Sequence, residues 1–186
     1  MSLTSKFRII ITIIAGICIQ LPMAGQGKYS ALNGKIRFFS SAPLEDIEAE
    51  SNKVKAALDT ETGDLLFIVP INTFVFDKSL MQKHFNEQYL ESDKYPEARF
   101  TGKMVPVPSM DFSSIQVLIR GELLIHGVKN DIETTAQLTK NEDLINGFSV
   151  FKVRLEDHDI KIPRMVIKNI AEVVEVTVSI DFLKAK

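Results

Sequence analysis

The chain has 186 residues, of which 45% are hydrophobic and 25% are charged. This length fits one domain, and this composition is ordinary for a globular protein. The 22 basic and 24 acidic residues form no strongly basic stretch, so nucleic acid is not an expected partner.

Residues 1–25 have the order of a secretory signal peptide. Basic residues come first, an apolar run over residues 9–21 follows, and a proline and small residues close the segment. The run has about 13 residues, whereas a membrane-spanning helix needs about 20. We therefore favour cleavage near Ala24 or Gly25 over an uncleaved anchor. We expect a mature domain over residues 26–186 that is periplasmic or secreted and has no membrane span.

The only cysteine, Cys18, lies inside this apolar run. A lipoprotein signal has small residues directly before its cysteine, whereas Ile17 stands there in this chain, so lipidation is the less favoured alternative. After cleavage the mature chain has no cysteine. This excludes a disulfide, a thiolate nucleophile and a cysteine metal cluster.

The first segment of the mature chain with a strand pattern is residues 34–41, which have Ile36 and Phe38 on one side. The acidic segment that follows, residues 42–53, contains Pro43 and is predicted to be a helical turn or loop. The sequence thus places the first strand before an irregular connection.

Two apolar runs at residues 54–59 and 64–71 flank a turn that ends in Gly63, a pattern typical of a β-hairpin. The second run is apolar on both faces, so we expect it to be covered on both sides.

Residues 77–92 form the one predicted helix. Apolar residues recur there at three- and four-residue spacing, and Asp77 or Ser79 is placed to cap the start. Pro96 ends any continuation, because the residue before a proline favours extended geometry.

The second half of the chain alternates between apolar and polar residues, which predicts strands. The predicted strands cover residues 97–107, 114–127, 128–139, 148–155 and 172–183, with a turn at 141–147. Roughly seven or eight alternating strands with a single helix favour an antiparallel sandwich or barrel. A barrel of about eight strands has room for one small ligand, but alternation does not tell a packed interior from a hollow one.

Three segments resemble the YceI-like family, secreted bacterial proteins that bind polyisoprenoids. The stretch HFNEQYLESDKYPEARFTG, residues 84–102, resembles the family's helix end, KYP and following strand. IRGELLIHGVKNDIE, residues 119–133, resembles a family hairpin, and EVTVSIDFLKA resembles its closing strand. The region that corresponds to the family's histidine-containing first segment, residues 29–53, lacks the histidines and carries an acidic insertion, so the resemblance extends to the fold but does not fix the ligand or the shape of the entrance.

The resemblance implies an all-β fold, an antiparallel eight-stranded lipocalin-like barrel with one short helix and an apolar tunnel. It implies a protein that sequesters or carries an isoprenoid-type lipid, without enzymatic activity, cofactor or metal. Homodimer formation stays open. Aromatic and branched side chains suit such a ligand, because affinity comes from apolar area removed from water. The candidates for tunnel lining are Phe38, Phe67, Phe74, Phe85, Phe100, Ile119, Leu123 and Phe151.

Catalytic or metal-binding histidines are the competing interpretation. His84 and Glu87 share a helix face, but catalytic zinc takes three protein ligands, so local packing of His84 is favoured. His126 is predicted to be a turn histidine that binds backbone groups, and His158 to lie in a solvated loop. Two alternatives to a lipid carrier remain. One is a hydrolase-like enzyme that uses the helix pair or His126 in a cleft. The other is an extracytoplasmic stress-response or structural protein with a filled core and no ligand.

Overall fold

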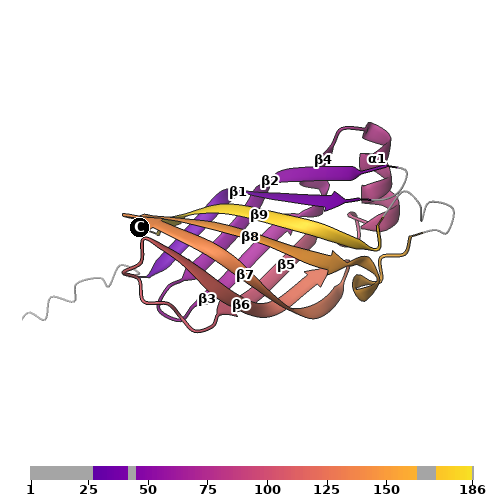
Figure 1. Cartoon of the computed structure of the whole chain (residues 1–186). Coiled ribbons are helices and arrows are strands. Elements are labelled where there is room, and N and C mark those ends of the chain that lie inside the picture. Colours follow the sequence, from indigo (N-terminus) through magenta and orange to yellow (C-terminus); the bar gives the residue numbers. More distant parts are fainter. Residues whose placement is uncertain (1–26, 42–44, 163–170, 186) are drawn as a thin grey trace, which may run out of the picture.

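The computed structural model describes residues 27–41, 45–162 and 171–185. Eight long strands close into an antiparallel barrel in the order β1-β9-β8-β7-β6-β5-β3-β2, and β2 pairs back with β1; the short β4 joins β2 at its edge (Figure 1). The predicted fold class is confirmed. The strands are β1 (Lys28–Ser40), β2 (Ile47–Asp59), β3 (Asp64–Pro70), β4 (Val75–Phe76), β5 (Glu97–Met104), β6 (Ser114–Ile125), β7 (Val128–Asn141), β8 (Leu144–Arg154) and β9 (Val173–Lys184).

The alternation of side chains along each strand sets inside and outside. In β9, Val174, Val176 and Phe182 are buried, whereas Glu175 and Asp181 between them are exposed. Successive side chains of a strand point to opposite faces, so the apolar set faces the barrel interior. A closed barrel needs no other layer to bury that face, which explains why one helix suffices.

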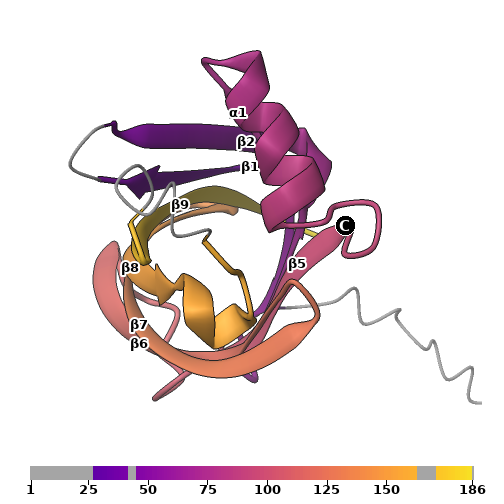
Figure 2. The same ribbon diagram turned by 90° about the vertical axis from the view of Figure 1, so that its right-hand side faces the viewer.

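The helical segments within residues 27–41, 45–162 and 171–185 all lie at one end of the barrel. They are α1 (Ser79–His84), a π-helical turn (Phe85–Tyr89) that continues it, and two 3-10 turns, η1 (Ile71–Thr73) and η3 (Leu155–His158). Figure 2 looks into this end, where α1 lies beside β1 and β2 and η3 lies across the ring of strands. None of the helical segments that the structure describes has the length and apolar character of a membrane span.

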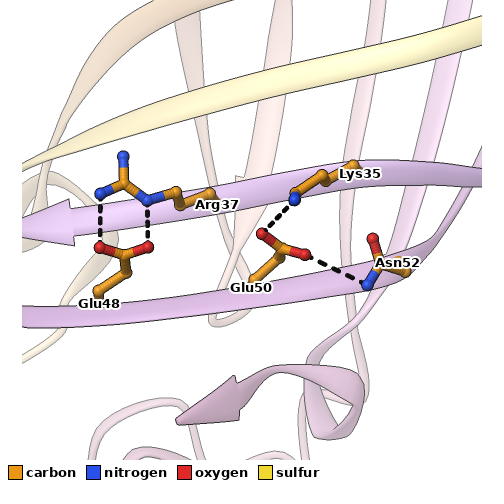
Figure 3. A network of polar contacts seen from close by, with 5 residues as sticks. All are labelled: Lys35, Arg37, Glu48, Glu50 and Asn52. Atoms are coloured by element: carbon orange, nitrogen blue, oxygen red, sulfur yellow. Dashed lines mark hydrogen bonds and ion pairs between the residues drawn. The ribbon is translucent and has the colours of Figure 1, made fainter. Parts of the chain in front are cut away.

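The first two strands of the barrel are longer than the sequence predicts. β1 starts at Lys28, and most of the acidic segment predicted as a helical turn or loop belongs to β2, which starts at Ile47. The acidic residues are the outward positions of a strand. Glu50 forms an ion pair with Lys35 at 2.6 Å, and Glu48 forms one with the Arg37 guanidinium (Figure 3).

The helix is shorter than predicted. It starts at Ser79, and neither predicted cap forms, because the flanking residue is Lys78 and no side chain binds the free N–H groups. The expected cover on both faces of β3 is also absent, since the outer Leu66 and Ile68 remain partly exposed. In the second half, β8 starts already at Leu144, so the turn before it is tighter than predicted.

The two ends of the interior differ in packing. At the end opposite α1, large side chains fill the barrel, and Met104, Ile145 and Phe182 are almost completely buried. We call this the packed end. The end that carries α1 and η3 is the hollow end, and the barrel cavity lies there.

Candidate functional site

The barrel interior contains a cavity of about 610 Å³, within the range of small-molecule sites. Side chains from all eight long strands contribute to its wall, together with β4, η1, α1 and η3. Hydrocarbon dominates this wall. The interior is therefore hollow, which the alternation of residues alone did not establish.

All eight candidate lining residues lie on this wall. Six come from strands and two from the segments around α1. The strand residues are Phe38, Phe67, Phe100, Ile119, Leu123 and Phe151, and the others are Phe74 and Phe85. Their position on the wall is a structural fact, whereas their contact with a lipid stays a prediction.

A cluster of four phenyl rings holds the helix against the barrel. Phe85 stacks on Phe38 with 5.5 Å between ring centroids, and it lies 5.5 Å from Phe74 and 5.0 Å from Phe76. Such distances are favourable for aromatic pairs. Three of these rings also line the cavity among the eight candidates, so the contacts that fix the helix shape the hollow end.

The position of Phe100 depends on two glycines. Gly102 and Gly121 pair across β5 and β6, and a Cβ atom on Gly102 would lie 2.3 Å from the Phe100 ring. The ring therefore occupies the space above these glycines. Glycine is required here by the close approach of an aromatic side chain rather than by backbone conformation.

The candidate set omitted many aliphatic residues of the wall. Because aromatic side chains were preferred, most inward aliphatic residues of the strands were passed over, although the same alternation identifies them. They include Ile36, Val54, Ile125, Ile132, Val153, Val174 and Val176.

A few polar side chains lie on the wall at the hollow end. Glu45 and Lys78 form an ion pair there, and His84 and Tyr89 come from the helical segments. Burial raises the pKa of Tyr89 above its usual value, so its hydroxyl is a neutral group at physiological pH. These groups could hydrogen-bond a ligand's polar end. Sequence analysis assigned none of them to a ligand's polar end, because they come from separate connections.

The helix pair does not form a metal site. His84 is partly buried on the cavity wall, whereas Glu87 is exposed and lies 4.0 Å from Lys83. Within the ranges that the structure describes, no three His, Cys, Asp or Glu side chains are grouped to hold a metal.

His126 joins two distant segments. Its Nδ1 donates to the carbonyl oxygen of His158 at 3.2 Å, as a turn histidine bound to backbone would. Its Nε2 lies 2.8 Å from the Glu91 carboxylate, a partner 35 residues away that no spacing could reveal. His126 and Glu91 are not part of the cavity wall. The two residues instead tie the turn after β6 to the segment after the helix.

The expectation for His158 is wrong. Only 2% of this residue is exposed, because η3 turns the ring inward while its acidic neighbours Glu156 and Asp157 face solvent. Nδ1 of His158 lies 3.2 Å from the carbonyl oxygen of Val128. The residue anchors η3 to the start of β7.

Solved structures share this fold at low identity. A polyisoprenoid-binding domain from Saccharophagus degradans, implicated in plant cell wall breakdown, has a TM-score of 0.73 and 14% identity, covering 85% of this chain and 98% of that one. BcnA from Burkholderia cenocepacia has a TM-score of 0.68 and 13% identity, covering 80% and 95%. The YCEI protein of Campylobacter jejuni has a TM-score of 0.52 and 18% identity, covering 67% and 75%. At these identities the likeness concerns the fold.

The family is shown by the sequence itself. No curated protein matches the chain. The model of the YceI-like domain, however, matches residues 25–182, which is most of the chain and extends from before β1 to near the end of β9. The protein therefore belongs to the YceI-like domain family.

Proposed function

We propose that this protein binds a long apolar lipid of the polyisoprenoid type in its barrel cavity and sequesters or carries it. The observation that carries this proposal is the cavity of about 610 Å³ with an almost wholly hydrocarbon wall. The polyisoprenoid-binding domain from Saccharophagus degradans, which has the same fold, supports the choice of lipid.

The wall suits a ligand that is recognised by shape and apolar area. Burial of apolar surface yields about 25 cal/mol per Å², so several hundred Å² of lipid chain supply several kcal/mol. Lining residues such as Phe67, Leu123 and Phe151 offer no hydrogen bonds that a polar substrate would need. A polar molecule placed there would lose its bonds to water without replacement.

The polar end of the lipid would lie near α1. The Lys78–Glu45 ion pair, His84 and the neutral Tyr89 hydroxyl are among the groups at that end that can donate or accept hydrogen bonds. In this orientation the head group would contact the polar groups near α1, and the lipid chain would lie along the apolar wall toward the packed end. No step of this function needs a chemical reaction, and we assign no catalytic residue.

We place the protein outside the cytoplasm. The support is the order of basic, apolar and small residues in residues 1–25, which is typical of a signal peptide. These residues lie outside the part of the chain that the structure describes. The family match begins at residue 25, where the proposed signal peptide ends. The mature domain would then be the barrel that begins with β1.

The test is to purify the full chain from the exported fraction of its own host and to analyse it by native mass spectrometry and organic extraction. We expect a bound polyisoprenoid in a stoichiometric amount. Protein that carries no lipid, or only the ordinary membrane phospholipids, would contradict the proposal. The variant H84A/E87A serves as the comparison. Loss of the His84 hydrogen bond to the polar end should lower the lipid content by no more than a few-fold, because the apolar wall supplies most of the affinity, whereas loss of a required metal site would abolish binding.

A further inference from the structure

The barrel has a seam between β7 and β8. These strands pair from Asn141 and Leu144 at the packed end to Ala136 and Ser149, and the register ends there. Both strands continue beyond that point. β7 stays paired with β6 as far as Val128, and β8 stays paired with β9 as far as Arg154. In Figure 1 the two strands run together near the C-terminus and separate toward the end that carries η3.

The seam is bounded at both ends. At its inner end, the Ser149 hydroxyl donates to the carbonyl oxygen of Thr135 at 2.8 Å and lies 3.3 Å from the Thr134 hydroxyl. At its outer end, η3 binds β7, because Asn130 donates to the carbonyl oxygen of Asp157 and His158 contacts Val128. Between these contacts the two edges face each other without a hydrogen-bond ladder.

The seam borders the cavity directly. Ile132 and Thr134 on β7, and Phe151 and Val153 on β8, are the inward residues of the two unpaired edges, and all four line the cavity. Ile132 packs in the same cluster as Phe151 and Val153. At the seam, side-chain packing takes the place of a backbone ladder between β7 and β8.

Two apolar side chains lie on the outer surface at the inner end of the seam. Phe148 and Val150 point outward on β8 and are 49% and 43% exposed. Of the charged residues on the two edges, Asp131 and Lys152 are exposed beside the seam, whereas Glu133 and Arg154 bind away from it. Glu133 on β7 pairs with Arg120 on β6 at 2.5 Å, and Arg154 on β8 pairs with Glu156 at 3.7 Å. An apolar chain that left the cavity through the seam would therefore meet Val150 and Phe148.

We infer that the β7–β8 seam is a lateral portal through which the chain of the bound lipid enters and leaves the barrel. This inference rests on the proposed lipid binding. Opening the seam separates side chains but breaks no backbone ladder, whereas opening β6–β7 or β8–β9 would break continuous ones. Local openings that break few hydrogen bonds are the most frequent in a folded protein.

A pair of engineered cysteines can lock the seam. In a Cys18→Ser background we would make T135C/V150C, at two exposed positions directly beyond the last paired residues. The matched control is T139C/N146C, which joins paired positions of the same two strands inside the ladder. Each pair is closed by oxidation, or by the short thiol crosslinker dibromobimane where a disulfide does not form, and is compared with its uncrosslinked form.

The readout is the rate at which two probes leave the cavity, measured by stopped-flow displacement. One probe is fluorescently labelled farnesol, and the other is 1-aminoanthracene, which needs only an apolar cavity. We expect the locked seam to slow release of both probes by about tenfold or more, and the locked control to change it by less than about twofold. Release that is equally fast with the seam locked would overturn the portal.

The two proposals fail in different ways. If farnesol does not bind but 1-aminoanthracene does, the isoprenoid ligand is wrong, and the dye still reports on the portal. If both bind and neither is slowed by the lock, the ligand stands and the portal is wrong. If neither probe enters the wild-type protein, both proposals are wrong.

Discussion

At the scale of single residues, the shape of the cavity depends on two glycines and one phenyl ring. Phe100 can lie over Gly102 and Gly121 because neither has a side chain. If either glycine carried a Cβ, the ring would have to move into the cavity, and the backbones of β5 and β6 would have to separate. The hollow end thus owes part of its shape to residues that contribute no side chain of their own.

The substitution Gly121→Ala tests this arrangement. The new Cβ would lie 2.4 Å from the carbonyl oxygen of Thr101 and 2.5 Å from Cα of Gly102, so backbone must shift. We expect a loss of at least about 2 kcal/mol in unfolding free energy, measured by chemical denaturation. The control is Gly147→Ala, where the nearest atom is a side-chain carbon of Ile180 at 3.0 Å. Its cost should stay below about 1 kcal/mol, and equal losses in both variants would contradict the explanation.

The histidines show the limit of local sequence information. The turn role of His126 could be predicted because a histidine before a glycine at a strand end is close to backbone groups. Its contact with Glu91 could not, since it depends on two segments meeting in space. His158 was mispredicted for the same reason. Acidic neighbours in the sequence suggested solvent, whereas the packing of η3 against β7 buries the ring.

At the scale of elements, the β1–β2 ribbon supports one side of the cavity. Its inward residues Ile36 and Phe38 belong to the wall. Its outward residues form the ion pairs of Figure 3, in which Lys35 binds Glu50 and Arg37 binds Glu48. The ion pairs on the outer face of β1 and β2 therefore hold these two strands together, while their inner face forms part of the cavity wall.

These ion pairs predict a pH dependence. The hydrogen bond from Arg37, with the charges of Arg37 and Lys35, lowers the pKa of Glu48 below 4.5. A carboxyl group with a lowered pKa contributes stability that is present above its unfolded-state pKa and is lost as the pH falls through the folded-state value. Glu48→Gln should thus reduce the melting temperature slightly at neutral pH and have no effect at strongly acidic pH.

The measurement is thermal unfolding of Glu48→Gln and the wild type between neutral and acidic pH, at low and high salt. Since both partners are substantially exposed, added salt should shrink the difference. Glu156→Gln is the control, because its 3.7 Å pair with Arg154 joins positions only two residues apart. A deficit that persists unchanged at strongly acidic pH would disprove the role of the Glu48 charge.

The elements that depend on a local pattern of residues could be predicted from the sequence, whereas features that depend on contacts between distant segments could not. Strict alternation, as in β6 and β9, gave the strands and the inward faces correctly. Residues 47–53 were missed because the inward positions of β2 are small, such as Ala49 and Ser51, and the acidic outward positions resembled a loop. The β7–β8 seam left no mark on the local pattern. Both strands alternate normally through it, and only the pairing between them stops.

At the scale of the whole molecule, the barrel combines a packed end and a hollow end built from the same kinds of residue. Phe182 and Ile145 are fully enclosed in the one, whereas Phe151 and Val176 line empty space in the other. Protein interiors are normally as dense as organic crystals, so an apolar cavity of this size forgoes packing energy unless a ligand fills it. Hollowness is a property of the assembled barrel and could be expected here only from the family resemblance.

Two alanine-to-phenylalanine substitutions compare the two ends. Ala98 on β5 lies on the wall of the large cavity, while Ala136 on β7 is buried at the packed side, beside a void of only about 40 Å³. Ala136→Phe should overpack and cost about 1–3 kcal/mol or more. Ala98→Phe should cost less, because its ring can extend into the cavity. It should also reduce the amount of bound lipid or shorten the chain that fits.

The experiment measures chemical unfolding of both variants and, in parallel, the lipid extracted from each after purification from the native host. The unfolding is done on lipid-free protein, so that loss of ligand does not appear as loss of intrinsic stability. A hollow, lipid-filled barrel requires that Ala98→Phe keeps most of its stability and loses lipid. If Ala98→Phe were as unstable as Ala136→Phe while its lipid content stayed at the wild-type level, the ring would have no free volume to enter, and the lipid would have to bind elsewhere on the molecule.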